Sequence, residues 1–122
     1  MRAVTLAVAA VAVALPTGVA AQAAAPAAPV TVTIRAEGTD MSGTVSSTKP
    51  LKCAANRTVK VFKLVNGQPH LWASDTTEKR GAKYVWSTGN TGTEGRFYAK
   101  VGAKKGCKMD LSPTIRVQRP AN

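Results

Sequence analysis

The sequence predicts an all-β protein, a seven-stranded antiparallel sandwich closed by one disulfide bond. Three observations lead to this prediction. Apolar and polar residues alternate with a period of two over most of residues 30–118, a pattern typical of half-buried strands. Short clusters of Gly, Asn, Asp and Pro separate the alternating runs. The chain has only two cysteines, Cys53 and Cys107, and they follow a segment with the features of an export signal.

The first 23 residues are expected to be a cleaved secretory signal peptide. Arg2 gives a positively charged start, residues 3–15 form a run of small apolar side chains interrupted only by Thr5, and residues 21–23 (Ala-Gln-Ala) match a small-x-small cleavage site. The apolar run is too short for a bilayer, which needs roughly 20 residues. We therefore expect cleavage after residue 23, with 21 and 25 as alternatives, a secreted, extracellular protein, and no stable membrane span.

Residues 24–29, rich in Ala and Pro, are expected to form a short flexible tail. Residues 30–119 are then expected to form the β-sandwich domain. The roughly 99 residues of the mature chain suffice for one domain with one hydrophobic core.

The first three strands are expected at residues 30–34, 41–46 and 57–65. In the first, Val or Ile alternates with Thr, and the second follows a Gly-Thr-Asp turn. The third is the strongest run, but its apolar residues change face after Val61. Either a β-bulge interrupts this strand, or both of its faces are covered.

Asn66-Gly67 is the preferred dipeptide of a tight hairpin, so the fourth strand, residues 71–74, is expected to return beside the third. Residues 82–87 form the fifth strand. Tyr84 and Trp86 share one face of it and are expected in the core. No segment of the mature chain shows the apolar stripe of a helix.

The last two strands are expected at residues 96–101 and 114–118. Cys53 lies just before the third strand, and Cys107 lies just after the sixth. These two strands are antiparallel neighbours in a seven-stranded Greek-key sandwich, so the start of one lies beside the end of the other. A Cys53–Cys107 disulfide is therefore expected. An intermolecular or redox-active pair is the alternative, but the chain has no C-x-x-C motif.

Several of these segments together resemble a known group of modules. The similarity is to bacterial secreted modules of the transthyretin-like (prealbumin-like, carboxypeptidase-regulatory-like) group, and it covers most of residues 41–117. The segments that carry it are Gly43-Thr44-Val45, Cys53, residues 57–62, Ser74-Asp75-Thr76 with Gly81, residues 95–101, Cys107 and residues 112–117. The resemblance implies an immunoglobulin-like sandwich used as an accessory or surface domain, generally without catalytic activity.

The residues themselves also argue against an enzyme. His70 is the only histidine, and Ser74 and Asp75 follow it too closely on one strand to form a catalytic triad. The acids are isolated in turns and loops, where solvated carboxylates are common. One histidine and two paired cysteines do not make a zinc site, and no loop has the alternating acids of an EF-hand. We expect no catalytic residue, no metal and no cofactor.

The chain is strongly basic, with 17 Lys and Arg against 6 Asp and Glu and a formal net charge of +11. Without Arg2 the net charge is +10, which favours association with polyanions such as nucleic acid, teichoic acid, acidic glycans or anionic lipid. Two local clusters are candidates for anion binding: Lys79, Arg80 and Lys83, and Lys104, Lys105 and Lys108. The alternative is a solvated face whose lysines block edge-to-edge association of strands.

Trp72 and Tyr98 are the aromatic residues expected at the surface, where a nucleic acid strand would need rings beside positive charge. The sequence thus predicts a secreted, non-catalytic, monomeric binding or accessory protein. Its partner is an unknown extracellular protein or an anionic polymer. A carrier of small apolar ligands, with a cleft between the sheets, is a further alternative.

Overall fold

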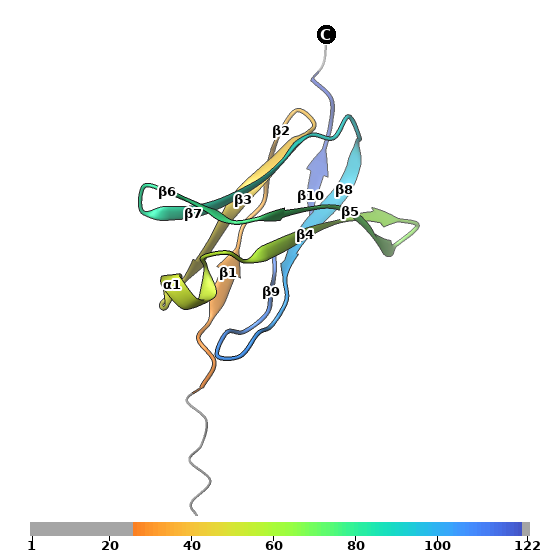
Figure 1. Cartoon of the computed structure of the whole chain (residues 1–122). Coiled ribbons are helices and arrows are strands. Elements are labelled where there is room, and N and C mark those ends of the chain that lie inside the picture. Colours follow the sequence, from red (N-terminus) through yellow and green to blue (C-terminus); the bar gives the residue numbers. More distant parts are fainter. Residues whose placement is uncertain (1–25, 121–122) are drawn as a thin grey trace, which may run out of the picture.

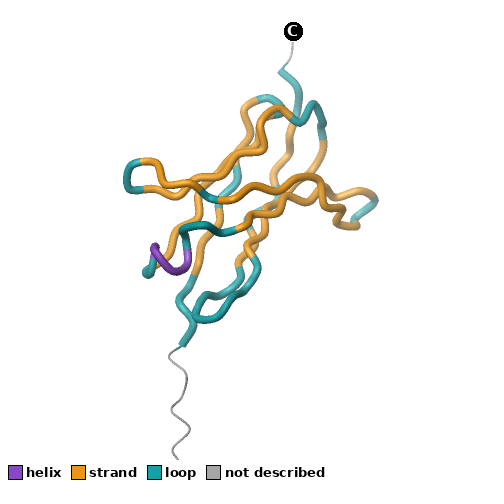
Figure 2. Tube along the Cα trace, viewed as in Figure 1, coloured by secondary structure: helices purple, strands orange, loops and turns teal. Residues whose placement is uncertain are grey.

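The structure, a computed structural model, describes residues 26–120, so the expected signal peptide at residues 1–23 lies outside the described residues. Ten strands and one helical turn follow along the chain (Figures 1 and 2): β1 (Val30–Val32), β2 (Arg35–Glu37), β3 (Asp40–Ser47), α1 (Pro50–Cys53), β4 (Thr58–Val65), β5 (Gln68–Thr76), β6 (Glu78–Arg80), β7 (Lys83–Asn90), β8 (Gly95–Val101), β9 (Asp110–Leu111) and β10 (Ile115–Val117). In this range no helix reaches the length and apolarity that crossing a bilayer requires.

The strands form two antiparallel sheets. Sheet one has the order β1-β3-β7-β6, with β2 also paired to β3, and sheet two has the order β10-β8-β4-β5, with β9 also paired to β8. β5 and β6 are consecutive but belong to different sheets, so the chain passes from sheet two to sheet one at Thr77. The expected all-β sandwich with one disulfide is confirmed.

The number of strands differs from the expected seven. All seven expected runs contain a strand, and the three additional strands, β2, β6 and β9, are short. Each lies next to an expected strand, across an interruption at Thr33-Ile34, at Thr77 and at residues 112–114. At two of these interruptions a side chain bonds to a backbone group that would pair within the sheet if the strand were unbroken. The Thr33 carbonyl accepts a hydrogen bond from Trp86 Nε1 at 3.1 Å, and Ser112 Oγ accepts one from the Ala99 N–H at 2.7 Å.

The core lies between the sheets and follows from the alternation. Trp86, Phe97 and Met41 are its largest fully buried side chains, and buried valines from β1, β3, β4, β8 and β10 surround them. Tyr84 is buried on the same face of β7 as Trp86, as expected. The outer faces of both sheets carry mostly polar and charged residues, with a few apolar side chains such as Phe62 and Tyr98 among them.

β4 is the expected third strand, and of the two alternatives considered for it a bulge is present, although the extra residue lies in the neighbouring β5. Its pairing with β5 shifts register between Val61 and Phe62, which is a bulge with Trp72 as the extra residue of β5. Its pairing with β8 is regular and brings Phe62 opposite Tyr98. On this outer face the two rings stack, with centroids 5.4 Å apart and planes 18° apart.

The hairpin between β4 and β5 is as expected. Asn66 and Gly67 both have positive φ, 53° and 76°, as the two-residue turn of a twisted hairpin requires. The asparagine-glycine pair therefore sets which residues of β4 and β5 face each other.

The packed chain begins before the expected boundary at residue 30. Ala28 is buried, its N–H donates to the carbonyl of Gly106 at 2.9 Å, and its carbonyl accepts from the N–H of Lys108 at 2.9 Å. The flexible tail expected at residues 24–29 therefore ends earlier than predicted, because the backbone of Ala28 is bound to the loop after β8. Residues 24 and 25 lie outside the described range.

Candidate functional site

The two cysteines form the expected disulfide at one end of the sandwich. Cys53 ends α1, and Cys107 lies in the loop of residues 102–109 between β8 and β9. Their Cα atoms are 5.5 Å apart across 54 residues of sequence, and both side chains are buried. The bond therefore brings α1 beside the loop of residues 102–109.

Arg57 holds the same end together from inside. Its guanidinium donates to the carbonyl of Cys53 at 2.8 Å and to the carbonyl of Gly102. The side chain is only 5% exposed, and burial lowers the pKa of Arg57 below its ordinary value, because removing the cation from water disfavours the charged form. This charge serves the fold, so Arg57 is not free to bind an external anion.

The lysines expected as an anion site at this end do lie together. Lys104, Lys105 and Lys108 are all exposed in the loop of residues 102–109. Lys104 and Cys107 pair through two backbone hydrogen bonds of 2.9 and 3.2 Å, which close a tight turn. Lys52 joins them, because its ammonium group lies against Gly106. We call Lys52, Lys104, Lys105 and Lys108 the disulfide-end cluster.

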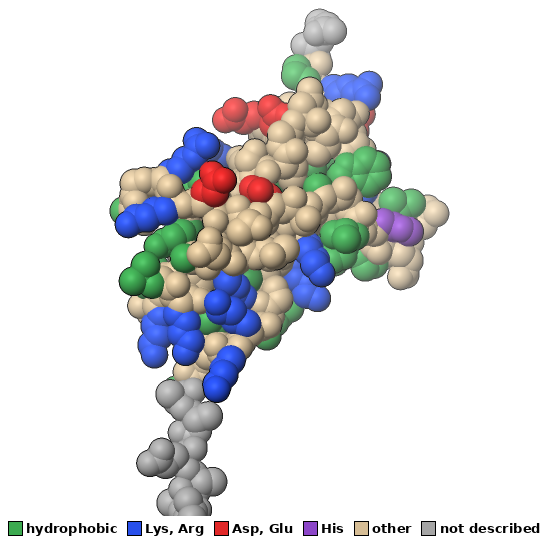
Figure 3. Space-filling view, in the orientation of Figure 1, with side chains coloured by type: hydrophobic (Ala, Val, Ile, Leu, Met, Phe, Trp, Pro, Cys, Tyr) green, Lys and Arg blue, Asp and Glu red, His purple; other side chains and the backbone are tan. Residues whose placement is uncertain are grey.

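Lys52 is not among the candidate residues predicted from the sequence. The signal was present, because Lys52 precedes Cys53 directly and a disulfide brings the neighbours of its two cysteines together. Figure 3 shows Lys and Arg side chains gathered around this end of the molecule, whereas Asp and Glu side chains lie in the other half of the same view.

The other expected anion site is divided by the strand geometry. In the β6–β7 pairing, Lys79 stands opposite the buried Tyr84, whereas Arg80 stands opposite Lys83. Successive residues of a strand point to opposite faces, so Arg80 and Lys83 share the outer face of sheet one and Lys79 does not. The structure therefore brings together only two of these three residues.

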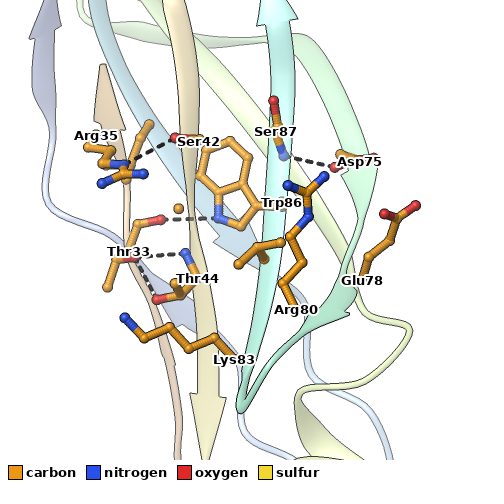
Figure 4. Close-up of a pocket in the computed structure, with 13 residues that line it drawn as sticks. Thr33, Arg35, Ser42, Thr44, Asp75, Glu78, Arg80, Lys83, Trp86 and Ser87 are labelled. Atoms are coloured by element: carbon orange, nitrogen blue, oxygen red, sulfur yellow. Dashed lines mark hydrogen bonds between the residues drawn. The ribbon is translucent and has the colours of Figure 1, made fainter. Parts of the chain in front are cut away.

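Arg80 and Lys83 border a hollow of about 590 Å³ on the outer face of sheet one (Figure 4). Small hydroxyl residues of β3 and β7 line its floor, and Arg35 lies at its rim, where its Nε donates to Ser42 Oγ at 3.3 Å. Asp75 and Glu78 also line the hollow. Because charges of both signs meet here, this hollow is a poor site for a polyanion.

The outer face of sheet two has a different charge pattern. Val59, Val61, Phe97, Ala99 and Val101 point into the core, so the residues between them point to solvent. The register places Lys60 opposite Lys100, and Arg96 opposite Arg116. Like charges directly opposite each other destabilise a sheet, so these pairs have a cost in the isolated protein.

No acid offsets these cations. All six acidic residues lie within the described range, and none of them occupies an outward position of β4, β8 or β10. Asp110 accepts from the Val32 N–H at 2.8 Å, Asp75 from the Ser87 N–H at 2.8 Å, and Glu94 from the Arg119 N–H at 2.9 Å. These three carboxylates are thus engaged elsewhere.

A second hollow, of about 510 Å³, joins this face to the disulfide-end cluster. Its lining includes Lys60, Phe62 and Lys100 from the outer face of sheet two and Lys104 from the cluster. Basic residues therefore continue without a break from the loop of residues 102–109 onto the outer face of sheet two.

The two aromatic residues expected at the surface lie in different places. Tyr98 is partly exposed on the outer face of sheet two, stacked on Phe62. Trp72 is 46% exposed, but its ring packs edge-on against the core residue Phe97 at 6.3 Å and lies 4.9 Å from the ammonium of Lys63. Trp72 therefore covers the edge of the core and lines neither hollow, which gives no support to an apolar carrier site beside it.

The residues considered for catalysis show no shared site. His70, Ser74 and Asp75 all belong to β5, and Asp75 already accepts a backbone hydrogen bond from β7. Among residues 26–120, no three His, Cys, Asp or Glu side chains gather in a way that would hold a metal ion.

The fold and these surfaces define a small basic β-sandwich with a continuous cationic surface. Compared with known proteins, the chain matches no family model and no curated protein.

Proposed function

We propose that this chain is a secreted, non-catalytic binding protein that holds anionic polymers outside the cell. One observation carries the proposal: the disulfide-end cluster and the outer face of sheet two form one basic surface that no acidic residue interrupts. We define this basic surface as the disulfide-end cluster together with Lys60, Lys100, Arg96 and Arg116.

The physical reason is the repulsion between like charges on the basic surface. Lys60 and Lys100 face each other, as do Arg96 and Arg116, and a bound polyanion would neutralise both pairs at once. It would also release its own counterions, which is the main source of affinity in such complexes at low salt. An anionic chain is favoured over a single small anion because the basic surface extends across three strands and a loop.

Two further observations support the location and class. The signal peptide expected at residues 1–23 and the buried disulfide between Cys53 and Cys107 are both typical of exported proteins. The proposal includes membership of the secreted transthyretin-like group, whose modules are two-sheet sandwiches of this general kind and are generally not catalytic.

The test is retention of the mature protein on immobilised heparin, a sulfated polymer without aromatic rings. We expect elution to require high salt, and we expect Lys104→Glu with Lys105→Glu to elute at much lower salt, because two cations of the basic surface are reversed. Lys79→Glu with Lys83→Glu is the matched control, since it changes the net charge equally but lies on β6 and β7 of sheet one. This control should elute close to the wild type.

Two results would contradict the proposal. Absence of retention at low salt would show that the basic surface is only solvated. Equal losses in the two double variants would show that net charge alone, without this surface, determines retention.

A further inference from the structure

We infer that the outer face of sheet two binds single-stranded nucleic acid, with the aromatic pair Phe62 and Tyr98 contacting bases. This inference rests on the proposed function and names the polymer. It comes from the juxtaposition of an outward-facing aromatic pair with two pairs of like charges on one sheet face.

The outward residues form rows across the strands. Lys60 and Lys100 make one row, Phe62 and Tyr98 make the next, and Arg96 with Arg116 lies in the third. At about 3.3 Å per residue along a strand, the two cationic rows lie about 13 Å apart, with the aromatic row midway between them. A polymer that fits must therefore carry anionic groups on both sides of a flat apolar group.

Single-stranded nucleic acid has this composition, since each phosphate is followed by a base with an aromatic face. Proteins that bind it without sequence preference combine a basic groove with aromatic side chains on which bases stack. Teichoic acids and acidic glycans have the negative charge but no aromatic group. The cationic rows alone would suit any of these polymers, and the aromatic row favours the nucleic acid.

The rings are not needed to fill the core. Phe62 and Tyr98 stand on the opposite side of their strands from the buried Val61 and Ala99, and both are partly exposed. Phe62 also lines the second hollow beside Lys60 and Lys100. With a volume of about 510 Å³, this hollow falls within the range of small-molecule sites and has room for a base.

The experiment compares two probes of equal length and phosphate content by fluorescence anisotropy: an oligothymidylate of about ten nucleotides and the corresponding abasic strand. The chosen length lies within the range that such surfaces cover. Stacking contributes about 1–3 kcal/mol per base, so we expect oligothymidylate to bind at least about fivefold more tightly than the abasic strand.

Three variants locate the contact. Tyr98→Leu keeps an apolar side chain but removes the ring, and should weaken oligothymidylate binding about tenfold without changing abasic binding. Tyr98→Phe keeps the ring and should bind both probes as the wild type does. Trp72→Leu removes an exposed aromatic residue that lies off this face, and should also leave both affinities unchanged. Circular dichroism and thermal unfolding confirm that each variant is folded.

The outcomes separate this inference from the proposed function. Equal affinity for the two probes, or an unchanged Tyr98→Leu variant, would overturn the base contact while polyanion binding stands. Retention on heparin without binding to either strand would likewise overturn the inference alone. No binding to heparin or to either strand would overturn both.

Discussion

Gly43 lies on the inner face of β3, opposite Trp86, and has no room for a side chain. A Cβ atom there would overlap the backbone carbonyl of Thr33 and would lie 2.8 Å from the indole Nε1 of Trp86. Because Gly43 has none, the indole reaches the Thr33 carbonyl and donates a hydrogen bond to it. The absence of a side chain at Gly43 thus makes room for the indole of Trp86, the largest core side chain. It also allows the Trp86–Thr33 hydrogen bond at the interruption between β1 and β2.

Gly43→Ala should therefore be strongly destabilising. The overlap is with backbone atoms, which cannot move aside as a flexible side chain can, so we expect the free energy of unfolding to fall by about 3 kcal/mol or more. Urea denaturation measures it. Gly102→Ala is the matched control, because a Cβ atom at Gly102 meets nothing within 4 Å. Similar losses in the two variants would contradict this account.

At the scale of elements, the last strand shows how one side chain replaces a stretch of sheet pairing. β9 and β10 both pair with β8, but residues 112–114 between them do not continue the strand. The hydroxyl of the buried Ser112 accepts from the Ala99 N–H at 2.7 Å and donates to the Pro113 carbonyl at 2.9 Å, while the Ser112 N–H donates to the Ala99 carbonyl. β8 therefore remains hydrogen-bonded across the gap.

Ser112→Ala removes the acceptor of the Ala99 N–H and leaves that buried donor without a partner. We expect a loss of about 1–3 kcal/mol in the free energy of unfolding, together with faster hydrogen exchange at the Ala99 amide. Ser74→Ala, at an exposed position of β5, should change stability by no more than about 0.5 kcal/mol. A stable Ser112→Ala variant whose Ala99 amide stays protected would show that another group, such as water, fills the role.

At the scale of the whole molecule, the disulfide is the one covalent link between distant parts of the described chain. It joins the segment before β4 to the loop after β8, two strands that pair through the centre of sheet two. Arg57 supports the same junction through its hydrogen bonds to Cys53 and Gly102. Both links hold the loop that carries most of the disulfide-end cluster.

Replacing both cysteines by serine should lower the free energy of unfolding by about 4 kcal/mol at most, the loop-entropy value for a loop of this length. Chemical denaturation of the double variant measures the loss, and wild-type protein under reducing conditions should behave in the same way. A loss below about 1 kcal/mol would show that the hydrogen bonds of Arg57 already constrain this end.

Local features of the sequence were enough to predict much of the fold. The alternation of β4 and β8, the turn at Asn66-Gly67 and the cysteine spacing depend on neighbouring residues or on a common topology, and all three predictions are confirmed. The strand interruptions were not predicted, because they depend on contacts such as Trp86 with Thr33 that join residues far apart in the chain.

The basic surface was only partly predictable for a related reason. The basic residues look spread along the sequence, and only the strand register brings Lys60 to Lys100 and Arg96 to Arg116. In the same way, nothing local distinguishes the buried Arg57 from the exposed arginines. The local cluster around Lys104 and Lys105 was found, because a single tight turn holds it.

The hydrogen bonds of Ala28 to the loop of residues 102–109 have a practical consequence for handling the protein. The chain enters the sandwich at the disulfide end, whereas Pro120 lies against Gly38 at the opposite end (Figure 1). A tag fused on the N-terminal side is therefore linked to the sandwich at the end that carries the lysines of the disulfide-end cluster. Tethering to a sensor chip through a tag after Pro120 leaves those lysines facing the solution.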